Sequence, residues 1–248
     1  VFLRIISAPW YLSLETRFML NKQFADKAKP ERLSGHKTVR VWDLPTRLFH
    51  WSLLVLVAVV WISSEFHGAL FNIHIIVGIA ILAMIVFRVI WGVIGSRHAL
   101  FIDFVCGWSK VRTYGQSMLN AKAAYHAGHN PIGGWMILAL LATLTLTSFS
   151  GLFISDDGYV GPLVGTVSSG LSNILGEAHE GVAGLLGFLI GIHVLGVVVH
   201  SIITQENLPR AMWSGHKSVP ADENISSIAR VGWWRVGVAV GLSIAAIW

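Results

Sequence analysis

The chain has 248 residues, of which 54% are hydrophobic and only 12% are charged. Soluble domains carry about 25% charged residues, so this composition excludes a large soluble globule and predicts an integral membrane protein. The net charge of +5 could indicate a nucleic-acid partner, but the basic residues are placed as in a membrane topology instead. The single Cys106 excludes an internal disulfide and a cysteine-ligated zinc site.

Five apolar stretches are the candidates for membrane-spanning helices, each of which needs about 20 residues. They are His50–Phe66, Phe71–Ile94, Gly133–Ile154, Gly181–Ile203 and Val231–Trp248. The first is short and reaches spanning length only if Leu48 and Phe49 are included. We therefore predict four spanning helices and a fifth at the C-terminal end.

The basic residues alternate along the chain in a way that gives the orientation. The segments flanking the predicted spans hold 9, 0, 4, 0 and 4 lysines and arginines in chain order, where the last count includes Arg235 at the start of the fifth span. Arg88 lies inside the second span. Cytoplasmic loops of membrane proteins are enriched in these residues. The pattern predicts a cytoplasmic N-terminus and, with five spans, a C-terminus on the outer side.

Four of the 11 histidines stand near the ends of the predicted spans, at matched depths. His179 and His193 are 14 residues apart on one span, which places them within about 40° of one helix face and about 21 Å apart along it. His74 is at the outer level, like His179, and His50 is at the inner level, like His193. The other histidines are expected at span edges (His67, His98), in polar segments (His36, His216) or without an assigned role (His126, His129).

Two pairs of imidazoles at separate depths indicate two bis-histidine haems in a helical bundle. We pair His50 with His193 at the inner level and His74 with His179 at the outer level. The chain has no C-x-x-C-H motif, so both haems would be non-covalent b-type. Zinc is disfavoured, because two ligands at each depth leave its set incomplete. The alternative for any single histidine is a polar tip in the headgroup zone.

Two further residues are candidate cofactor contacts. His200 lies seven residues beyond His193, about 10 Å nearer the cytoplasmic surface. It could replace His193 as a ligand, but contact with a haem propionate or a quinone is favoured, because His193 is more deeply placed. Arg88 lies 14 residues after His74 on the same face, and its guanidinium would either bind a haem propionate or extend to the cytoplasmic headgroups.

Several motifs of the chain resemble those of a known family. They are the run from Val41 to Trp51 (VWDLPTRLFHW), His74 with Gly78, Arg88 to Ser96, Gly128 to Pro131 with Gly133, Gly151 to Phe153 with Asp156 and Asp157, His179 with Glu180, and Glu206 to Met212. Over residues 38–217 the chain is similar to the prokaryotic cytochrome b561 and nickel-hydrogenase b-type cytochrome superfamily. The similarity is greatest to proteins with a cytochrome b/b6 domain.

The resemblance implies an all-α integral membrane protein of the bacterial inner membrane, built as a four-helix bundle around two haems b. It implies ligation by His50, His74, His179 and His193. Electrons would pass between a quinone or quinol pool and a redox partner, such as a c-type cytochrome, a dehydrogenase or a hydrogenase. The expected organisation is an N-terminal extension (1–37), a di-haem domain (38–217), and a linker with a fifth helix (218–248). The extension departs from the family pattern by its length.

Mechanistically, we predict a respiratory electron carrier with no catalytic residue acting on a carbon substrate, in contact with lipid and without nucleic acid. It would serve at most as the quinone-reactive subunit of an oxidoreductase.

The acidic outer loop (Asp156, Asp157, Glu177) suits a basic partner, or merely reflects the lack of basic residues outside. The alternatives are a haem-containing anchor subunit of a larger respiratory complex, a superoxide:quinone oxidoreductase, and a transporter with a histidine proton relay. The absence of an acidic residue deep in a predicted span disfavours the transporter.

Overall fold

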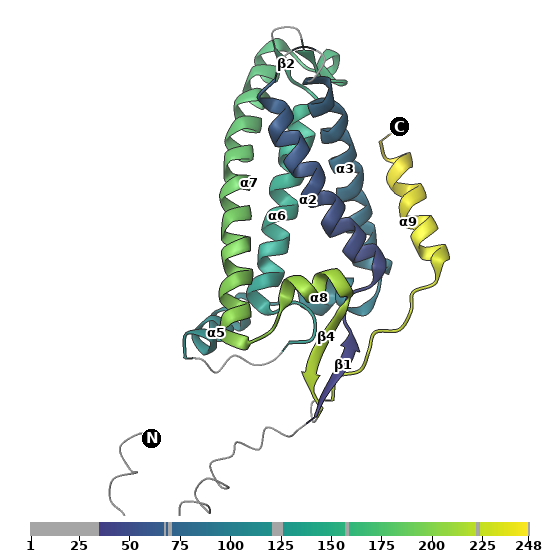
Figure 1. Cartoon of the computed structure of the whole chain (residues 1–248). Helices are drawn as coiled ribbons and strands as arrows, with labels where there is room; N and C mark the ends of the chain where they lie inside the picture. The colour runs from purple at the N-terminus through teal and green to yellow at the C-terminus, as the bar shows by residue number, and fades with distance from the viewer. Residues whose placement is uncertain are drawn as a thin grey trace, which may run out of the picture. The chain divides into compact units, whose positions relative to one another are not determined.

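The computed structural model describes residues 35–66, 68, 71–120, 126–156, 159–221 and 224–247 (Figure 1). Four of its helices are long and apolar enough to cross a membrane: α2 (Leu44–Ser64), α3 (Phe71–Ile94), α6 (Pro131–Gly151) and α7 (Ser169–Thr204). The predicted four-helix membrane bundle is therefore confirmed. The predicted N-terminal extension, residues 1–37, lies outside the described residues except for its last three.

Helix-capping side chains explain why three of these helices begin before the apolar stretches do. Asp43 Oδ1 accepts from the backbone N–H of Thr46 at 2.7 Å and caps α2, and Pro45 occupies its first turn. Asn130 caps α6 in the same way, with Pro131 in the first turn. Ser168 caps α7, whose 36 residues extend well past the predicted span. Caps and prolines set helix ends, whereas hydropathy reports only the buried or lipid-facing part.

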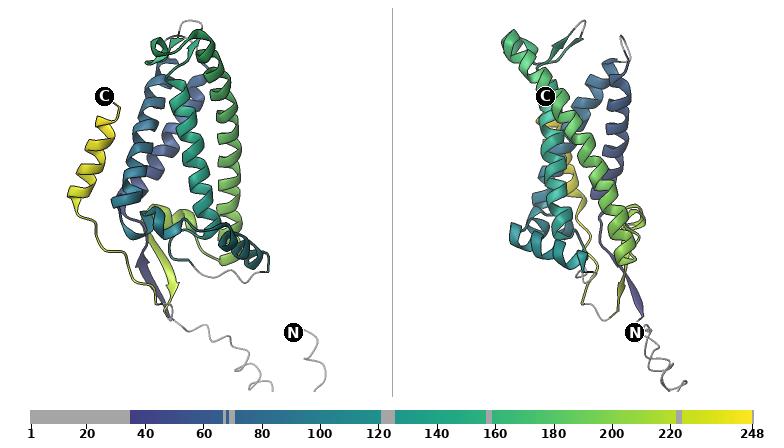
Figure 2. Two further views of the ribbon diagram at one scale, coloured as in Figure 1. Left: turned by 180° about the vertical axis from the view of Figure 1, so that it is seen from behind. Right: turned by 90° about the vertical axis from the view of Figure 1, so that its left-hand side faces the viewer.

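The four long helices pack side by side, with α3 against α2 and α6, and α6 against α7 (Figures 1 and 2). Their shared core contains four fully buried residues: Ile81, Ile85, Leu144 and Leu186. Large apolar side chains such as Phe188 and Ile202 remain exposed on α7. An exposed apolar surface on every long helix is typical of a membrane protein, in which lipid covers it.

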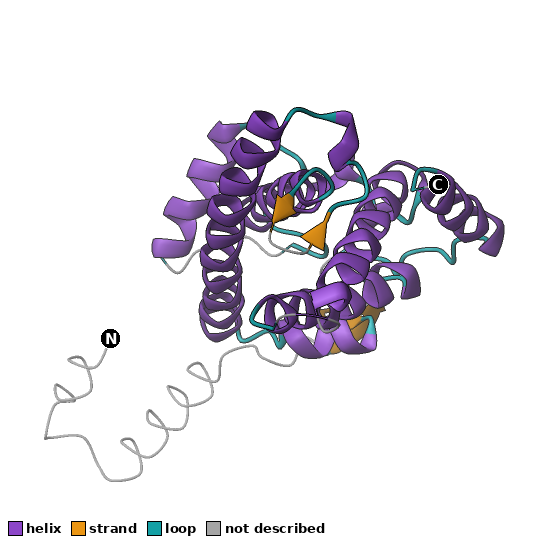
Figure 3. Ribbon diagram, turned by 90° about the horizontal axis from the view of Figure 1, so that it is seen from above, coloured by secondary structure: helices purple, strands orange, loops and turns teal. Residues whose placement is uncertain are grey.

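Shorter elements lie at the two ends of the bundle, which we name outer and inner after the predicted topology. The outer end carries the short strands β2 (Ser155–Asp156) and β3 (Tyr159–Val160), which pair antiparallel, and the 3₁₀ turn η3 (Val164–Thr166) (Figure 3). The inner end carries η2 (Arg97–Ala99), α4 (Phe101–Phe104), α5 (Trp108–Leu119) and α8 (Leu208–Ser214). Strands β1 (His36–Arg40) and β4 (His216–Pro220) form a two-stranded sheet.

The last helix, α9 (Trp233–Ala245), has 13 residues and packs against α3. Ala239 of α9 is fully buried in a cluster with Trp91, and the Arg235 side chain donates to the carbonyl of Ile94 at 3.1 Å. Thirteen residues are fewer than the ~20 that cross a bilayer. A fifth span, and with it an outer C-terminus, stays a prediction.

Candidate functional site

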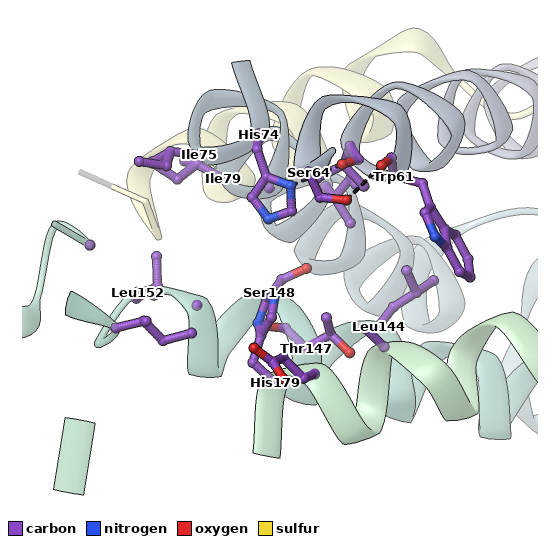
Figure 4. Close-up of a pocket in the computed structure, with 18 of the residues that line it drawn as sticks. Trp61, Ser64, His74, Ile75, Ile79, Leu144, Thr147, Ser148, Leu152 and His179 are labelled. Atoms are coloured by element: carbon purple, nitrogen blue, oxygen red, sulfur yellow. Dashed lines mark hydrogen bonds between the residues drawn. The ribbon is translucent and has the colours of Figure 1, made fainter. Parts of the chain in front are cut away.

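A cavity of about 390 Å³ lies among α2, α3, α6 and α7 near the outer end of the bundle. His74 of α3 and His179 of α7 both line it (Figure 4). Gly78, Gly151 and Glu180 line it as well. The remaining lining is mostly aliphatic side chains, with a few hydroxyl groups. A largely apolar cavity with a few convergent polar groups, and a volume of about 300–1,000 Å³, is typical of a cofactor site.

The two imidazoles in this cavity are held by backbone carbonyls. His74 Nδ1 lies 2.9 Å from the carbonyl oxygen of Val60, and His179 Nδ1 lies 2.9 Å from that of Thr147. A carbonyl oxygen only accepts, so each Nδ1 carries the proton and each Nε2 keeps a free lone pair. An imidazole whose second nitrogen donates to a carbonyl is fixed in the tautomer and orientation that bind a metal.

The distance between these rings fits a shared metal. Their centroids are 6.1 Å apart, with an interplanar angle of 63°. An imidazole nitrogen binds a transition metal at about 2.0 Å and its ring centre is roughly 1 Å farther out, so two rings on one metal are about 6 Å apart. A Cβ added to Gly78, one turn below His74, would meet nothing within 4 Å. The ring separation and this open space both fit a haem between His74 and His179.

At the inner level, the structure brings His50 of α2 and His193 of α7 together. The two imidazoles lie close enough for their charges to interact. His50 Nδ1 is buried and has no hydrogen-bond partner among the described residues. An unpaired buried nitrogen is costly unless a bound group or water satisfies it. The inner imidazoles are thus grouped but, unlike the outer ones, are not both held by carbonyls.

Arg88 is buried on the inner half of α3. It is 3% exposed, and its guanidinium lies over the rings of Phe101 and Phe104, at 5.0 and 5.9 Å from their centroids. The predicted alternative, a side chain extended to the headgroups, does not fit this burial. Its Nη1 is buried and unpartnered within the described part of the chain, and the charge of Asp43 acts on the guanidinium. A free buried guanidinium nitrogen suits a carboxylate.

His200 lies closer to the end of α7 than the other candidates. Its Nδ1 is 3.4 Å from Nδ2 of Asn130, the residue that caps α6. Glu206 and Lys217, which form an ion pair of 3.0 Å, act on its charge. His200 therefore belongs to a polar group at the inner end of the bundle, and the structure places His193, rather than His200, beside His50.

His129, which had no assigned role in the sequence, lies near the centre of the inner region. Its ring is 4.5 Å from that of Trp42 and 4.9 Å from that of Phe104, and its buried Nδ1 has no partner in the described ranges. Burial, with the charges of Arg88 and Lys217, lowers the pKa of His129 to about 3. His129 is therefore neutral at physiological pH. The GHNP motif contained this residue, but its sequence position gave no depth.

Asp43 and His98 also escaped the sequence-based assignment of the inner region. Asp43 Oδ2 accepts from Trp91 Nε1 at 3.1 Å, which joins the start of α2 to α3. His98, expected at a span edge, is buried, and its Nδ1 lies 2.7 Å from Oδ2 of Asp103. These contacts join residues from separate segments, so sequence spacing alone could not identify them.

Comparison with known families identifies the family of the chain. A family model described as prokaryotic cytochrome b561 matches residues 41–215. No curated protein and no solved structure gives a significant match. The matched range covers the four long helices and all six candidate residues: His50, His74, Arg88, His179, His193 and His200. The chain therefore belongs to the prokaryotic cytochrome b561 family and is a multi-pass membrane b-type cytochrome that takes part in electron transfer.

Proposed function

We propose that the protein conducts electrons across the bacterial inner membrane through two haems b, one between His74 and His179 and one between His50 and His193. The observation that carries this proposal is the outer pair, whose rings are 6.1 Å apart with both Nδ1 atoms on backbone carbonyls. When bound, each haem supplies a one-electron iron couple. The chain's own residues hold that couple in place and set its surroundings.

Helix α7 links the two levels. His179 and His193 both belong to this uninterrupted helix, which rises about 21 Å between them. One rigid element thus provides one ligand at each depth, and α2 and α3 provide the others. This arrangement supports transfer along the bundle rather than chemistry at one surface.

Arg88 and His50 support the inner half of the proposal. Arg88 has a buried, unpartnered Nη1, and His50 has a buried, unpartnered Nδ1. A haem propionate would give the guanidinium the anion that a buried cation needs. His50 Nδ1 would be satisfied by an ordered water, or the ring would bind through this nitrogen.

A quinone site is proposed near His200, at the inner end of α6 and α7. His200 and Asn130 are 3.4 Å apart and half-buried, so a lipid-soluble quinone would reach them from the membrane. Imidazole and amide N–H groups are the donors that quinone carbonyls accept from. A redox partner, a c-type cytochrome or other subunit, would bind the outer side, where Glu177 and Glu180 are described and Asp157 lies outside the described residues.

The test is a dithionite-reduced minus oxidised spectrum of the purified protein, with haem quantified per chain as the pyridine haemochrome. Two b-type haems per chain are expected. One haem would mean that one histidine pair is wrong, and the inner pair, with His200 as the other candidate ligand, would be re-examined first. A protein without haem would overturn the proposal and favour a transporter.

A further inference from the structure

The inner end of the bundle contains a buried carboxylate, that of Asp43, which is not a proposed haem ligand. Asp43 is 9% exposed and is the only Asp or Glu in the described part of the chain that is fully buried. One of its oxygens accepts from the N–H of Thr46 at 2.7 Å, and the other accepts from Trp91 Nε1 at 3.1 Å. A single side chain therefore fixes both the start of α2 and its distance from α3.

Capping alone does not explain a carboxylate at this position. Asn and Ser cap helices as well as Asp does, and burying a carboxylate costs several kcal/mol unless an opposite charge compensates it. The compensating charge is that of Arg88, which is one turn before Trp91 on α3 and interacts with Asp43. Among the described residues, Arg88 has no direct ion-pair partner, so this interaction acts over a longer distance.

The backbone around Asp43 is also fixed. The N–H groups of Val41 and Trp42 both donate to the carbonyl of Gly215, at 2.9 and 3.1 Å. Trp91, the partner of Asp43 on α3, is 0% exposed. His50 follows Asp43 by two helical turns, about 10 Å along nearly the same face of α2. The cap thus sets the rotation of the helix that presents His50.

We propose that Asp43 is a positioning residue for the inner haem site, where it holds His50 and Arg88 in place and lowers the reduction potential of that haem. The proposal rests on the function proposed above. Reduction adds one electron to the iron, and a nearby negative charge opposes that addition. A carboxylate at this position therefore lowers the reduction potential of the haem, which a neutral capping residue would not do.

The experiment is a redox titration of the membrane-bound protein, followed by the absorbance of reduced haem b. Asp43→Asn keeps one oxygen to cap α2 but removes the charge and the second oxygen, which accepts from Trp91 Nε1. The potential of one haem should rise and that of the other should not. The reduced-to-oxidised ratio at a fixed potential should increase on the order of tenfold, as expected for a unit charge roughly 10 Å away at an effective dielectric constant of about 20.

Four further variants separate the effect of charge from that of structure. Arg88→Gln should shift the same haem in the opposite direction, and Asp43→Asn combined with Arg88→Gln should return its potential toward that of the wild type. Trp91→Phe removes the hydrogen bond but no charge, so it should move the potential much less. His193→Ala should eliminate the haem component that responds to Asp43→Asn, which identifies that component as the inner one.

Each outcome decides the proposal. Two bound haems with unchanged potentials in Asp43→Asn would overturn it, as would an equal shift of both haems. If Asp43→Asn fails to accumulate, Arg88→Gln provides the test, and an unchanged potential there is equally damaging. A wild-type protein without two haems would instead contradict the proposed function itself, so the two failures are distinguishable.

Discussion

The outer and inner histidine pairs are held in different ways. At the outer level, His74 and His179 are both fixed by backbone carbonyls and line a cavity of mainly aliphatic residues. At the inner level, the surroundings of His50 and His193 include Arg88, Asp43 and neutral His129. Several buried polar atoms there have no partner among the described residues: Thr46 Oγ1, Arg47 Nε, His50 Nδ1, Arg88 Nη1 and His129 Nδ1.

This difference indicates two ways of building a haem site. The outer site is organised by the protein alone, because its carbonyls orient both imidazoles before any group binds. The inner site contains five polar atoms without a partner among the described residues, whereas the outer cavity has one, Thr147 Oγ1. Each such atom costs about 1–3 kcal/mol when buried. A bound group that satisfies those atoms would stabilise the inner end of the bundle more than the outer end.

The largest expected effect is the loss of one haem from each single ligand variant. His179→Ala should remove only the outer haem, and His193→Ala only the inner haem, so haem per chain should fall from two to one in both. His216→Ala is the matched control, since His216 is exposed and its ring Nδ1 lies 2.9 Å from the carbonyl of nearby Ser214. Loss of both haems from either ligand variant would show that the two sites are not independent.

Filling the outer cavity should affect the outer site alone. Gly78→Leu places a side chain where a Cβ meets nothing within 4 Å, so the bundle should fold while the outer haem is displaced. Gly237→Leu on α9 is the control, because its Cβ position is equally open but lies away from the cavity. Haem content and the spectrum of each variant provide the measurement. Full haem content in Gly78→Leu would contradict the placement of the outer haem.

The outer and inner sites also differ in how far the sequence predicted them. The depths of His74 and His179 follow from hydropathy and helical rise, and the structure brings their rings together. The contact of Asp43 with Trp91, by contrast, joins residues 48 positions apart. The sequence predicted that the third span begins at Gly133, which left His129 in a loop of unknown depth. In the structure Asn130 caps α6 and the helix begins at Pro131, so His129 lies directly before the first turn of the helix. Spacing along a helix is local information, whereas the inner contacts depend on how loops fold back.

The proposed quinone site would extend the inner end toward the membrane. His200→Leu should leave both haems bound but weaken quinol binding, since one hydrogen bond of about 1–2 kcal/mol is lost. The KM for a soluble quinol should rise about 5- to 30-fold with a smaller change in kcat. Quinol-dependent haem reduction in stopped flow measures both. Loss of a haem in this variant would instead make His200 a ligand, and unchanged kinetics would place the quinone elsewhere.

The smallest expected effect is a pH dependence confined to the inner end. His129 has its pKa lowered to about 3 by burial first and by Arg88 and Lys217 second, whereas an unfolded histidine titrates near 6.5. Below that value the unfolded state binds a proton that the folded state does not, so folding is destabilised as the pH falls.

His129→Phe keeps aromatic contact with Trp42 and Phe104 but removes this titration. Between pH 7 and pH 5, the wild type should lose about 1–2 kcal/mol more stability than the variant. Thermal unfolding in detergent across this pH range measures the difference, and protonation of the ligand histidines is common to both proteins and cancels. If the stability of the wild type and of His129→Phe changed in parallel with pH, His129 would be accessible to solvent. The inner site would then not be closed, and its contrast with the carbonyl-held outer site would have to be revised.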